Sequence, residues 1–151
     1  RWPVEYQVRN LKMEKIIQKI REIYPVSDEA LQALQANMEL RYYPKDTYIV
    51  QSGVTDRLVY FIEEGIARSV FHHNGQDTTT WFTLEGDITF GMDSLYYQQP
   101  SVESIETLSD CFSGNKYLPV RDPISTRSTF EKFRKDFFYI LILTVDRYLT
   151  F

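Results

Sequence analysis

The sequence predicts an α+β domain, mainly β, in which helical segments precede and follow a block of about eight short strands. Apolar residues recur at helical spacing near both ends, whereas the middle of the chain alternates apolar and polar residues between glycine turns. The aromatic share of 15%, with 11 Tyr and 10 Phe, suits strands and a well-packed core. Short strands at regular intervals favour a small sandwich or barrel. We expect three units: an N-terminal helical segment at residues 1–38, a β-rich unit at 39–120 and C-terminal helices at 121–151.

Two helices are predicted before the strands. In residues 11–23 (LKMEKIIQKIREI), Ile16 and Ile20 lie on one apolar stripe, with Lys and Glu elsewhere. Ser27 has the side chain of an N-cap and precedes a second predicted helix over residues 29–38. The apolar period then changes from helical to alternating, so the strand block begins there.

Turn residues divide the middle of the chain into strand-length runs. Residues 39–53 alternate and turn at Pro44-Lys45-Asp46, and Glu64-Gly65 and Asn74-Gly75 are hairpin signals. The later runs are residues 57–65, 66–75, 76–86, 101–114 and 116–120.

A strongly apolar helix is predicted near the end of the chain. Phe137, Leu141, Thr144 and Tyr148 recur at spacings of three and four, and neighbouring apolar residues widen this stripe to nearly the whole circumference. Such a helix should be buried between its own domain and a partner subunit, so we expect a homodimer formed through it. Its longest apolar run, residues 137–145, has about half of the roughly 20 residues that a membrane span requires, so no membrane association is expected.

The charge balance argues against direct nucleic-acid binding. The 17 Lys and Arg residues are scattered among 21 Asp and Glu residues, with a net charge of -4. A surface that binds duplex DNA needs clustered Lys and Arg to replace phosphate counterions. The single Cys111 excludes an internal disulfide and fits a reducing cytoplasm, and no basic-then-apolar leader opens the sequence.

Other residue groupings favour structural roles. His72 and His73 are adjacent on a strand and point to opposite faces, so no metal site is expected, and no cofactor either. Cys111 alone cannot hold an iron–sulfur cluster, which takes about four thiolates, and a lone strand Cys is usually a core residue. No catalytic grouping is recognisable, so no enzyme activity is expected. The aromatic residues for which a stacking pocket and the commoner core role are both open are Tyr60, Phe61, Trp81 and Phe82.

The glycine and aromatic pattern of the strand block resembles the cyclic-nucleotide-binding fold, specifically the effector domain of Crp/Fnr-type transcription regulators. The resemblance runs in order through IVQSG (49–53), LVYFIEEGIARS (58–69), LEGDITFG (84–91) and LYYQQP (95–100). It implies a double-stranded β-helix (jelly-roll-like) fold, with residues 39–120 as a β-roll effector domain. N-terminal helices and a long C-terminal dimerisation helix would flank this roll.

The family's phosphate-binding cassette has counterparts here without insertion or deletion. In the family, Phe-Gly-Glu precedes a small residue and Leu, and Pro-Arg with small or hydroxyl residues follows; the Glu binds the ribose hydroxyl and the Arg binds the phosphate. This sequence has Met92 in place of the Glu and Ser101 in place of the Arg. The candidate ligand-binding residues of this degenerate cassette are Phe90, Gly91, Met92, Ser94, Leu95, Ser101, Val102 and Ser104.

Loss of both charged groups should weaken nucleotide binding. Each charge-assisted hydrogen bond contributes roughly 1.5–3 kcal/mol, so the pair accounts for about two to four decades of affinity. Asp93 and Glu103 add negative charge beside the proposed anion site, and helix-start amides compensate only slightly. Cyclic AMP and cyclic GMP are therefore not expected to bind at physiological concentration. Two possibilities stay open: a pocket for a small uncharged or weakly charged effector, or a cassette filled by side chains.

The resemblance implies a cytoplasmic, noncatalytic effector and dimerisation domain of a Crp/Fnr-like transcription regulator. In that family, occupancy of the roll shifts the packing of the long helix and so reorients a DNA-reading helix-turn-helix. No helix-turn-helix is recognisable in the 151 residues, so contact with DNA is expected only through a domain absent from this chain. The alternative is a stand-alone cyclic-nucleotide-binding-like interaction module without a ligand.

Overall fold

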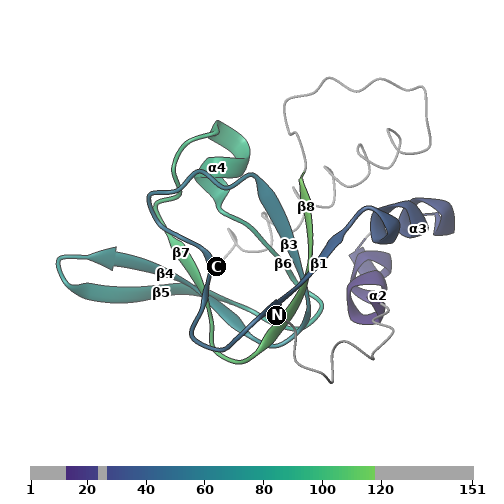
Figure 1. Ribbon diagram of the computed structural model, residues 1–151, viewed down its shortest axis with the longest axis horizontal. Helices are drawn as coiled ribbons and strands as arrows, with labels where there is room; N and C mark the ends of the chain where they lie inside the picture. The colour runs from purple at the N-terminus through teal and green to yellow at the C-terminus, as the bar shows by residue number, and fades with distance from the viewer. Residues whose placement is uncertain (1–12, 24–26, 118–151) are drawn as a thin grey trace.

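The computed structural model describes residues 13–23 and 27–117, in which eight strands form two four-stranded antiparallel sheets (Figure 1). One sheet has the strand order β1-β8-β3-β6 and the other has the order β2-β7-β4-β5. The predicted mainly β architecture is therefore confirmed over these residues. The strands are β1 (Glu39–Tyr43), β2 (Tyr48–Val50), β3 (Leu58–Glu64), β4 (Ala67–His73), β5 (Gln76–Thr83), β6 (Ile88–Thr89), β7 (Ser104–Thr107) and β8 (Cys111–Tyr117).

Both predicted hairpin turns use glycine in a left-handed backbone conformation. Gly65, between β3 and β4, has a φ of 99°, and Gly75, between β4 and β5, has a φ of 76°. A Cβ atom on Gly65 would lie 2.3 Å from the carbonyl oxygen of Asp110 and 2.6 Å from Sγ of Cys111. The first turn therefore passes close against the start of β8, where only a residue without a side chain fits.

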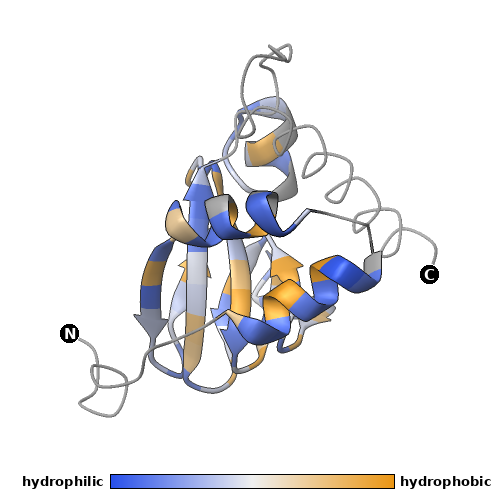
Figure 2. Cartoon of the chain, turned by 90° about the vertical axis from the view of Figure 1, so that its right-hand side faces the viewer, coloured by the Kyte–Doolittle hydropathy of each residue, from blue (hydrophilic) through white to orange (hydrophobic). Residues whose placement is uncertain are grey.

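Two amphipathic helices, α2 (Glu14–Ile23) and α3 (Asp28–Ala36), pack on the β1-β8-β3-β6 sheet. Ile16 and Ile20 of α2 are buried in one cluster with Phe61 of β3. Figure 2 shows hydrophobic and hydrophilic residues interleaved along α2, as expected for a helix with one face against the strands. The two predicted N-terminal helices are therefore confirmed, although α3 begins and ends slightly before the predicted bounds.

A buried carboxylate joins α2 to the sheet. Glu63 of β3, only 4% exposed, accepts hydrogen bonds from the backbone N–H of Lys15 at 2.9 Å and of Ile16 at 3.1 Å. N–H groups in the first turn of a helix have no partner within the helix, so this side chain caps α2 from the sheet. Burial raises the pKa of Glu63 above its ordinary value, and the two N–H groups oppose that shift.

The space between the two sheets holds a second apolar cluster. Along β3, Phe61 faces the helices, while Tyr60 and Ile62 belong to the cluster between the sheets. Successive side chains of a strand point to opposite faces, so β3 is buried on both sides and reads as a nearly continuous apolar run. The buried members of the second cluster are Ile49, Val50, Tyr60, Ile62, Ala67 and Ile105.

The boundaries predicted for the last two strands are wrong. The sequence pattern divides this region into runs at 101–114 and 116–120, but the structure has β7 and β8 with β8 running through Gly114. Gly114 pairs with a strand on each side, so it does not end a strand. A Cβ atom there would lie 2.6 Å from Sδ of Met38. Glycine at this position thus makes room for a side chain from outside the strand.

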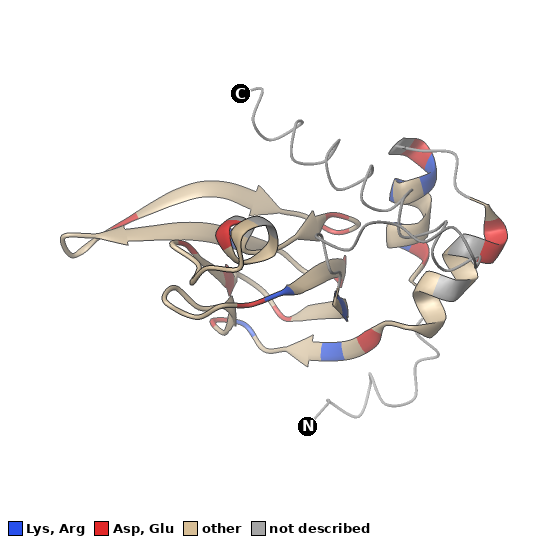
Figure 3. Cartoon of the chain, turned by 90° about the horizontal axis from the view of Figure 1, so that it is seen from above, with Lys and Arg blue, Asp and Glu red and all other residues tan. Residues whose placement is uncertain are grey.

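The predicted dimerisation helix, including Phe137, Leu141, Thr144 and Tyr148, lies outside the described residues. Within residues 13–23 and 27–117, no helix combines the length and apolar character needed to cross a bilayer. Figure 3 shows the Lys and Arg residues of this part of the chain dispersed among Asp and Glu residues, as the sequence indicates.

Candidate functional site

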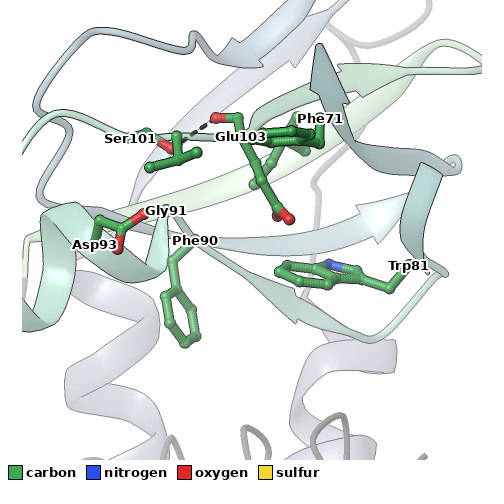
Figure 4. A pocket seen from close by; sticks show the side chains of 9 residues that line it. Phe71, Trp81, Phe90, Gly91, Asp93, Ser101 and Glu103 are labelled. Carbon is green, nitrogen blue, oxygen red and sulfur yellow. Dashed lines mark hydrogen bonds between the residues drawn. The ribbon is translucent and has the colours of Figure 1, made fainter. Parts of the chain in front are cut away.

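A pocket of about 410 Å³ opens between the β4–β5 hairpin and the segment that runs from β6 through α4 (Met92–Tyr97) to β7 (Figure 4). Its volume lies within the range of about 300–1,000 Å³ that is usual for small-molecule sites. The hairpin contributes two aromatic rings, and the segment from β6 to β7 contributes the other lining residues. The lining residues are Phe71, Trp81, Phe90, Gly91, Asp93, Ser101, Val102, Glu103 and Ile105.

The structure brings only part of the predicted cassette to this pocket. Leu95 packs in the core cluster shared with α2, and Ser94 and Ser104 are buried but do not line the pocket. Met92 begins α4, and the placement of its side chain lies outside the described part of the structure. The predicted residues that do line the pocket are Phe90, Gly91, Ser101 and Val102.

Gly91 and Ser101 are packed against each other. A Cβ atom on Gly91 would lie 3.3 Å from Oγ of Ser101 and 3.5 Å from Cγ1 of Val50. Gly91 has a φ of -77°, which any residue can adopt, so glycine is needed here for close approach and not for backbone conformation. Ser101 is 4% exposed. Its short side chain therefore occupies the space beside Gly91.

The three cassette serines use their hydroxyl groups within the protein. Ser101 Oγ donates to the carbonyl oxygen of Glu103 at 2.6 Å, and Ser94 Oγ donates to a carbonyl just after α4 at 2.7 Å. Ser104 Oγ accepts a hydrogen bond from the backbone N–H of Ser52 at 3.0 Å. In this structure the three hydroxyl groups therefore form hydrogen bonds with the backbone and stabilise the conformation of the loop.

The turn at residues 51–54 holds the backbone of Ser101 on both sides. The N–H of Gly53 donates to the carbonyl oxygen of Ser101 at 2.8 Å, and the N–H of Ser101 donates to the carbonyl oxygen of Val54 at 3.0 Å. Gly53 has a φ of 86°, a conformation that favours glycine. The family-like turn therefore positions the cassette through backbone contacts that do not depend on the residue at position 101.

Two carboxylates, Asp93 and Glu103, line the pocket with the rings of Phe71 and Trp81. In Figure 4 the carboxylate of Glu103 projects toward the space between these rings. Burial raises the pKa of Glu103 above its ordinary value and the charge of Asp93 raises it further, whereas a hydrogen bond with Thr80 opposes the shift. None of the lining residues that the structure describes is Lys, Arg or His. The side-chain charge of this described lining is thus negative.

Sequence reasoning missed Phe71 and Ile105 as pocket residues, and it considered Asp93 and Glu103 only as neighbours of an anion site. The pairing of β4 with β5 brings Phe71 and Trp81 to one pocket, and its register shifts between Ser69 and Val70. A β-bulge changes which side chains face inward and leaves no clear mark in a local pattern. Strand alternation alone therefore could not have identified this pair of rings.

The other aromatic candidates separate into core and surface. Tyr60 and Phe61 are buried, so the core role is confirmed for both. Phe82 is 53% exposed, so the core role is wrong for it. Trp81 is half-buried in the pocket wall. This position is compatible with the stacking role, which stays a prediction. Because successive residues of β5 point to opposite faces, an inward Trp81 places Phe82 outside.

The histidines and the cysteine lie where the sequence placed them. His72 and His73 are exposed near the end of the β4–β5 hairpin, and His72 pairs with Asp77. Cys111 is buried at the start of β8, and burial raises the pKa of its thiol to about 11. Among the residues that the structure describes, no group of three or more His, Cys, Asp or Glu side chains is arranged to hold a metal ion.

Residues 40–113 match the family of cyclic nucleotide-binding domains. This part of the chain is therefore similar to cyclic nucleotide-binding domains. The matched segment begins in β1 and ends in β8, so it contains most of both sheets, α4 and the described pocket lining. No curated protein matches the chain in sequence.

Many solved protein chains are similar to this chain in fold, including the following three. A cyclic nucleotide-binding domain from Methylobacillus flagellatus is 16% identical, with a TM-score of 0.67 over 91% of this chain and 83% of its own. The c-di-GMP-responsive global regulator CLP from Xanthomonas campestris is 12% identical, with a TM-score of 0.69 over 82% of this chain and 60% of its own.

The third is the regulatory subunit of a cAMP-independent protein kinase A from Trypanosoma brucei. It is 18% identical, with a TM-score of 0.65 over 87% of this chain and 46% of its own. That structure is a triple mutant, one of whose substitutions introduces an arginine, bound to cAMP in the A site. Identities this low show a shared fold alone, and the chain spans about half the length of CLP and of the kinase subunit.

Proposed function

We propose that this chain is the noncatalytic ligand-sensing and dimerisation domain of a Crp/Fnr-like transcription regulator in the cytoplasm, and that its pocket does not bind cAMP. The observation that carries the proposal is the pocket wall: Ser101 fills the space beside Gly91, and Asp93 and Glu103 line the same pocket. A cyclic phosphodiester would meet two carboxylates there and no cationic side chain among the described lining residues.

Electrostatics gives the expected size of this effect. Two like charges about 5 Å apart repel by about 3 kcal/mol at an effective dielectric constant of about 20. One carboxylate at that distance would weaken phosphate binding by about two decades, in addition to the loss of the arginine contact. The six-residue α4 provides little compensation, since its dipole is that of a very short helix.

The volume of the pocket favours a ligand over a cassette filled by side chains. An occupant would contact the β4–β5 hairpin and the α4 segment together, because the lining comes from both. A ligand that bridges two elements can change their relative positions only by binding one arrangement more tightly than the other. Sensing in this domain would thus consist of a shift between two arrangements of the hairpin and the α4 segment.

Dimerisation and DNA contact belong to segments other than the described pocket. The apolar stripe with Leu141 and Tyr148 would pair two subunits, and a helix-turn-helix outside the 151 residues would contact DNA. The fold is compatible with this role, since the regulator CLP, described as linking cell–cell signalling to virulence gene expression, has a similar fold.

A stand-alone interaction module without a ligand is the second candidate. It is favoured by the three cassette serines, whose hydroxyl groups bond to the backbone and not into the pocket. Under this proposal the roll would serve only as a scaffold for dimerisation or docking.

Calorimetric titration of the protein with cAMP and cGMP tests the proposed pocket, and we expect no saturable heat at micromolar concentrations. Micromolar binding of either nucleotide would overturn it. Sedimentation tests the dimer: Leu141→Asp should convert a dimer to a monomer, because a buried unpaired charge is costly in an apolar interface. A dimer that survives this substitution would remove the pairing role from that face.

A further inference from the structure

The charge and the rings of the pocket point to a ligand class opposite to that of a nucleotide. We propose that the pocket binds a small organic cation that carries a flat apolar group, such as a protonated aromatic amine. This inference rests on the proposed function only in that the pocket is a ligand site. It differs from both possibilities that the sequence left open, which were a neutral or weakly charged ligand and a cassette filled by side chains.

The rings supply the apolar part of the site. Phe71 on β4 and Trp81 on β5 line the same pocket, and both are partly exposed there. The face of an indole ring attracts a cation within about 6 Å of its centre, and tryptophan is the strongest of the aromatic residues in this respect. A flat group that stacks on these rings would bury apolar area on the ligand and the protein together.

The carboxylates supply the charge. In Figure 4 Glu103 extends its carboxylate toward the space between the two rings, and Asp93 reaches the same pocket from α4. Within residues 13–23 and 27–117, no cation among the lining residues neutralises them. Two carboxylates in a partly buried pocket repel each other, and an entering ammonium or guanidinium group would relieve that repulsion. An anion would increase it, and a neutral ligand would leave it unchanged.

A metal ion fits these walls less well than an organic cation. Hard divalent ions take about six to eight oxygen ligands, whereas this lining offers two carboxylates among apolar and aromatic groups. No group of three or more potential metal ligands occurs among the described residues. The combination of aromatic faces with carboxylates is instead the chemistry that recognises ammonium groups.

Tryptamine and indoleacetate form a probe pair with one ring system and opposite charges, and calorimetry of the whole 151-residue chain with each tests the proposal. We expect tryptamine to bind at least about tenfold more tightly than indoleacetate, since one charge contact of moderate strength changes affinity by about that factor. Glu103→Gln should weaken tryptamine binding about tenfold and leave indoleacetate unchanged or slightly improved. Trp81→Ala should weaken both probes, because it removes the stacking surface.

Asp46→Asn is the matched control for charge. Asp46 is exposed on the turn between β1 and β2, away from the pocket lining, and asparagine tolerates its φ of 64°. This variant should bind tryptamine as the wild type does. Asp93→Asn, which makes the same change in net charge inside the pocket, provides a second test if Glu103→Gln fails to fold in a thermal melt.

The outcomes separate this inference from the proposed function. Equal or tighter binding of indoleacetate, no measurable binding of tryptamine, or unchanged tryptamine binding in both pocket variants would overturn the inference. Indoleacetate binding would still leave the pocket a ligand site for something other than cAMP. Micromolar cAMP binding in the same experiment would instead overturn the proposed function.

Discussion

Ser101 and Gly91 pack against each other in the pocket wall: a Cβ atom on Gly91 would lie 3.3 Å from Ser101 Oγ, which donates to the carbonyl oxygen of Glu103 at 2.6 Å. The position at which the family resemblance expects an arginine thus holds a short, buried side chain bonded to its own loop. Neighbouring backbone bonds keep the loop in place. The backbone conformation of the cassette therefore does not require a charged side chain at position 101.

Restoring the two family residues should create cAMP binding. Met92→Glu combined with Ser101→Arg would supply the ribose and phosphate contacts, which together are worth about two to four decades of affinity. Calorimetry with cAMP measures the gain, and Met92→Gln with Ser101→Gln is the control with similar bulk and no charge. If the charged variant binds cAMP no better than this control, the phosphate site does not lie beside Gly91.

Removing the cap of α2 should destabilise the domain. Glu63→Ala leaves the N–H groups of Lys15 and Ile16 without their acceptor, and we expect a loss of about 2 kcal/mol in the free energy of unfolding. Glu63→Gln keeps an acceptor oxygen and carries no charge to bury. Because burial of the charge is what raises the pKa of Glu63, this variant should lose less than about 1 kcal/mol in the free energy of unfolding. Urea denaturation measures both. Equal losses in the two variants would contradict the capping role.

Two turn glycines should differ in their tolerance of alanine. Gly65→Ala combines a left-handed backbone with a Cβ atom 2.3 Å from the carbonyl oxygen of Asp110, so we expect a loss of more than about 3 kcal/mol. Gly75→Ala meets no atom within 4 Å and bears only the backbone strain, about 1–2 kcal/mol. Thermal or urea unfolding should separate the two variants clearly. Comparable losses would mean that β8 can move away from the first turn.

Titration of Glu103 should appear in the pH dependence of stability. In the folded protein the pKa of Glu103 lies above its ordinary value of 4.5, chiefly because of burial and further because of the charge of Asp93. The folded state therefore binds this proton more tightly than the unfolded state does. Stability therefore falls as pH rises from below 4.5 through the raised pKa, and Glu103→Gln lacks this change. The free energy of unfolding of the wild type, measured relative to that variant, should be highest near the acid end and lower at neutral pH. Parallel curves for the two proteins would show that Glu103 is not desolvated in the pocket.

Local patterns in the sequence were sufficient for the N-terminal helices and the first strands of the roll, but not for the bounds of β7 and β8. A strand-length apolar run between turn signals identified β3 around Tyr60, and helical spacing identified α2 through Ile16 and Ile20. The hairpin turns at Gly65 and Gly75 were also recognisable, because a positive φ restricts the residue type at a single position. These features depend on residues close together in the chain, which is why they can be read without a structure.

The sequence by itself determined most strands and turns of a roll, and it places Met92 and Ser101 at the two positions where the family resemblance predicts charged ligand groups. Only the tertiary structure decided that Glu63 caps a helix 47 residues earlier in the chain, and that Phe71, Trp81, Asp93 and Glu103 line one pocket. A bulge sets the register of the two rings, and the packing of Met38 leaves no room for a Cβ atom on Gly114 within β8. Contacts between distant segments depend on register and crossing geometry, which local hydrophobic periodicity does not encode.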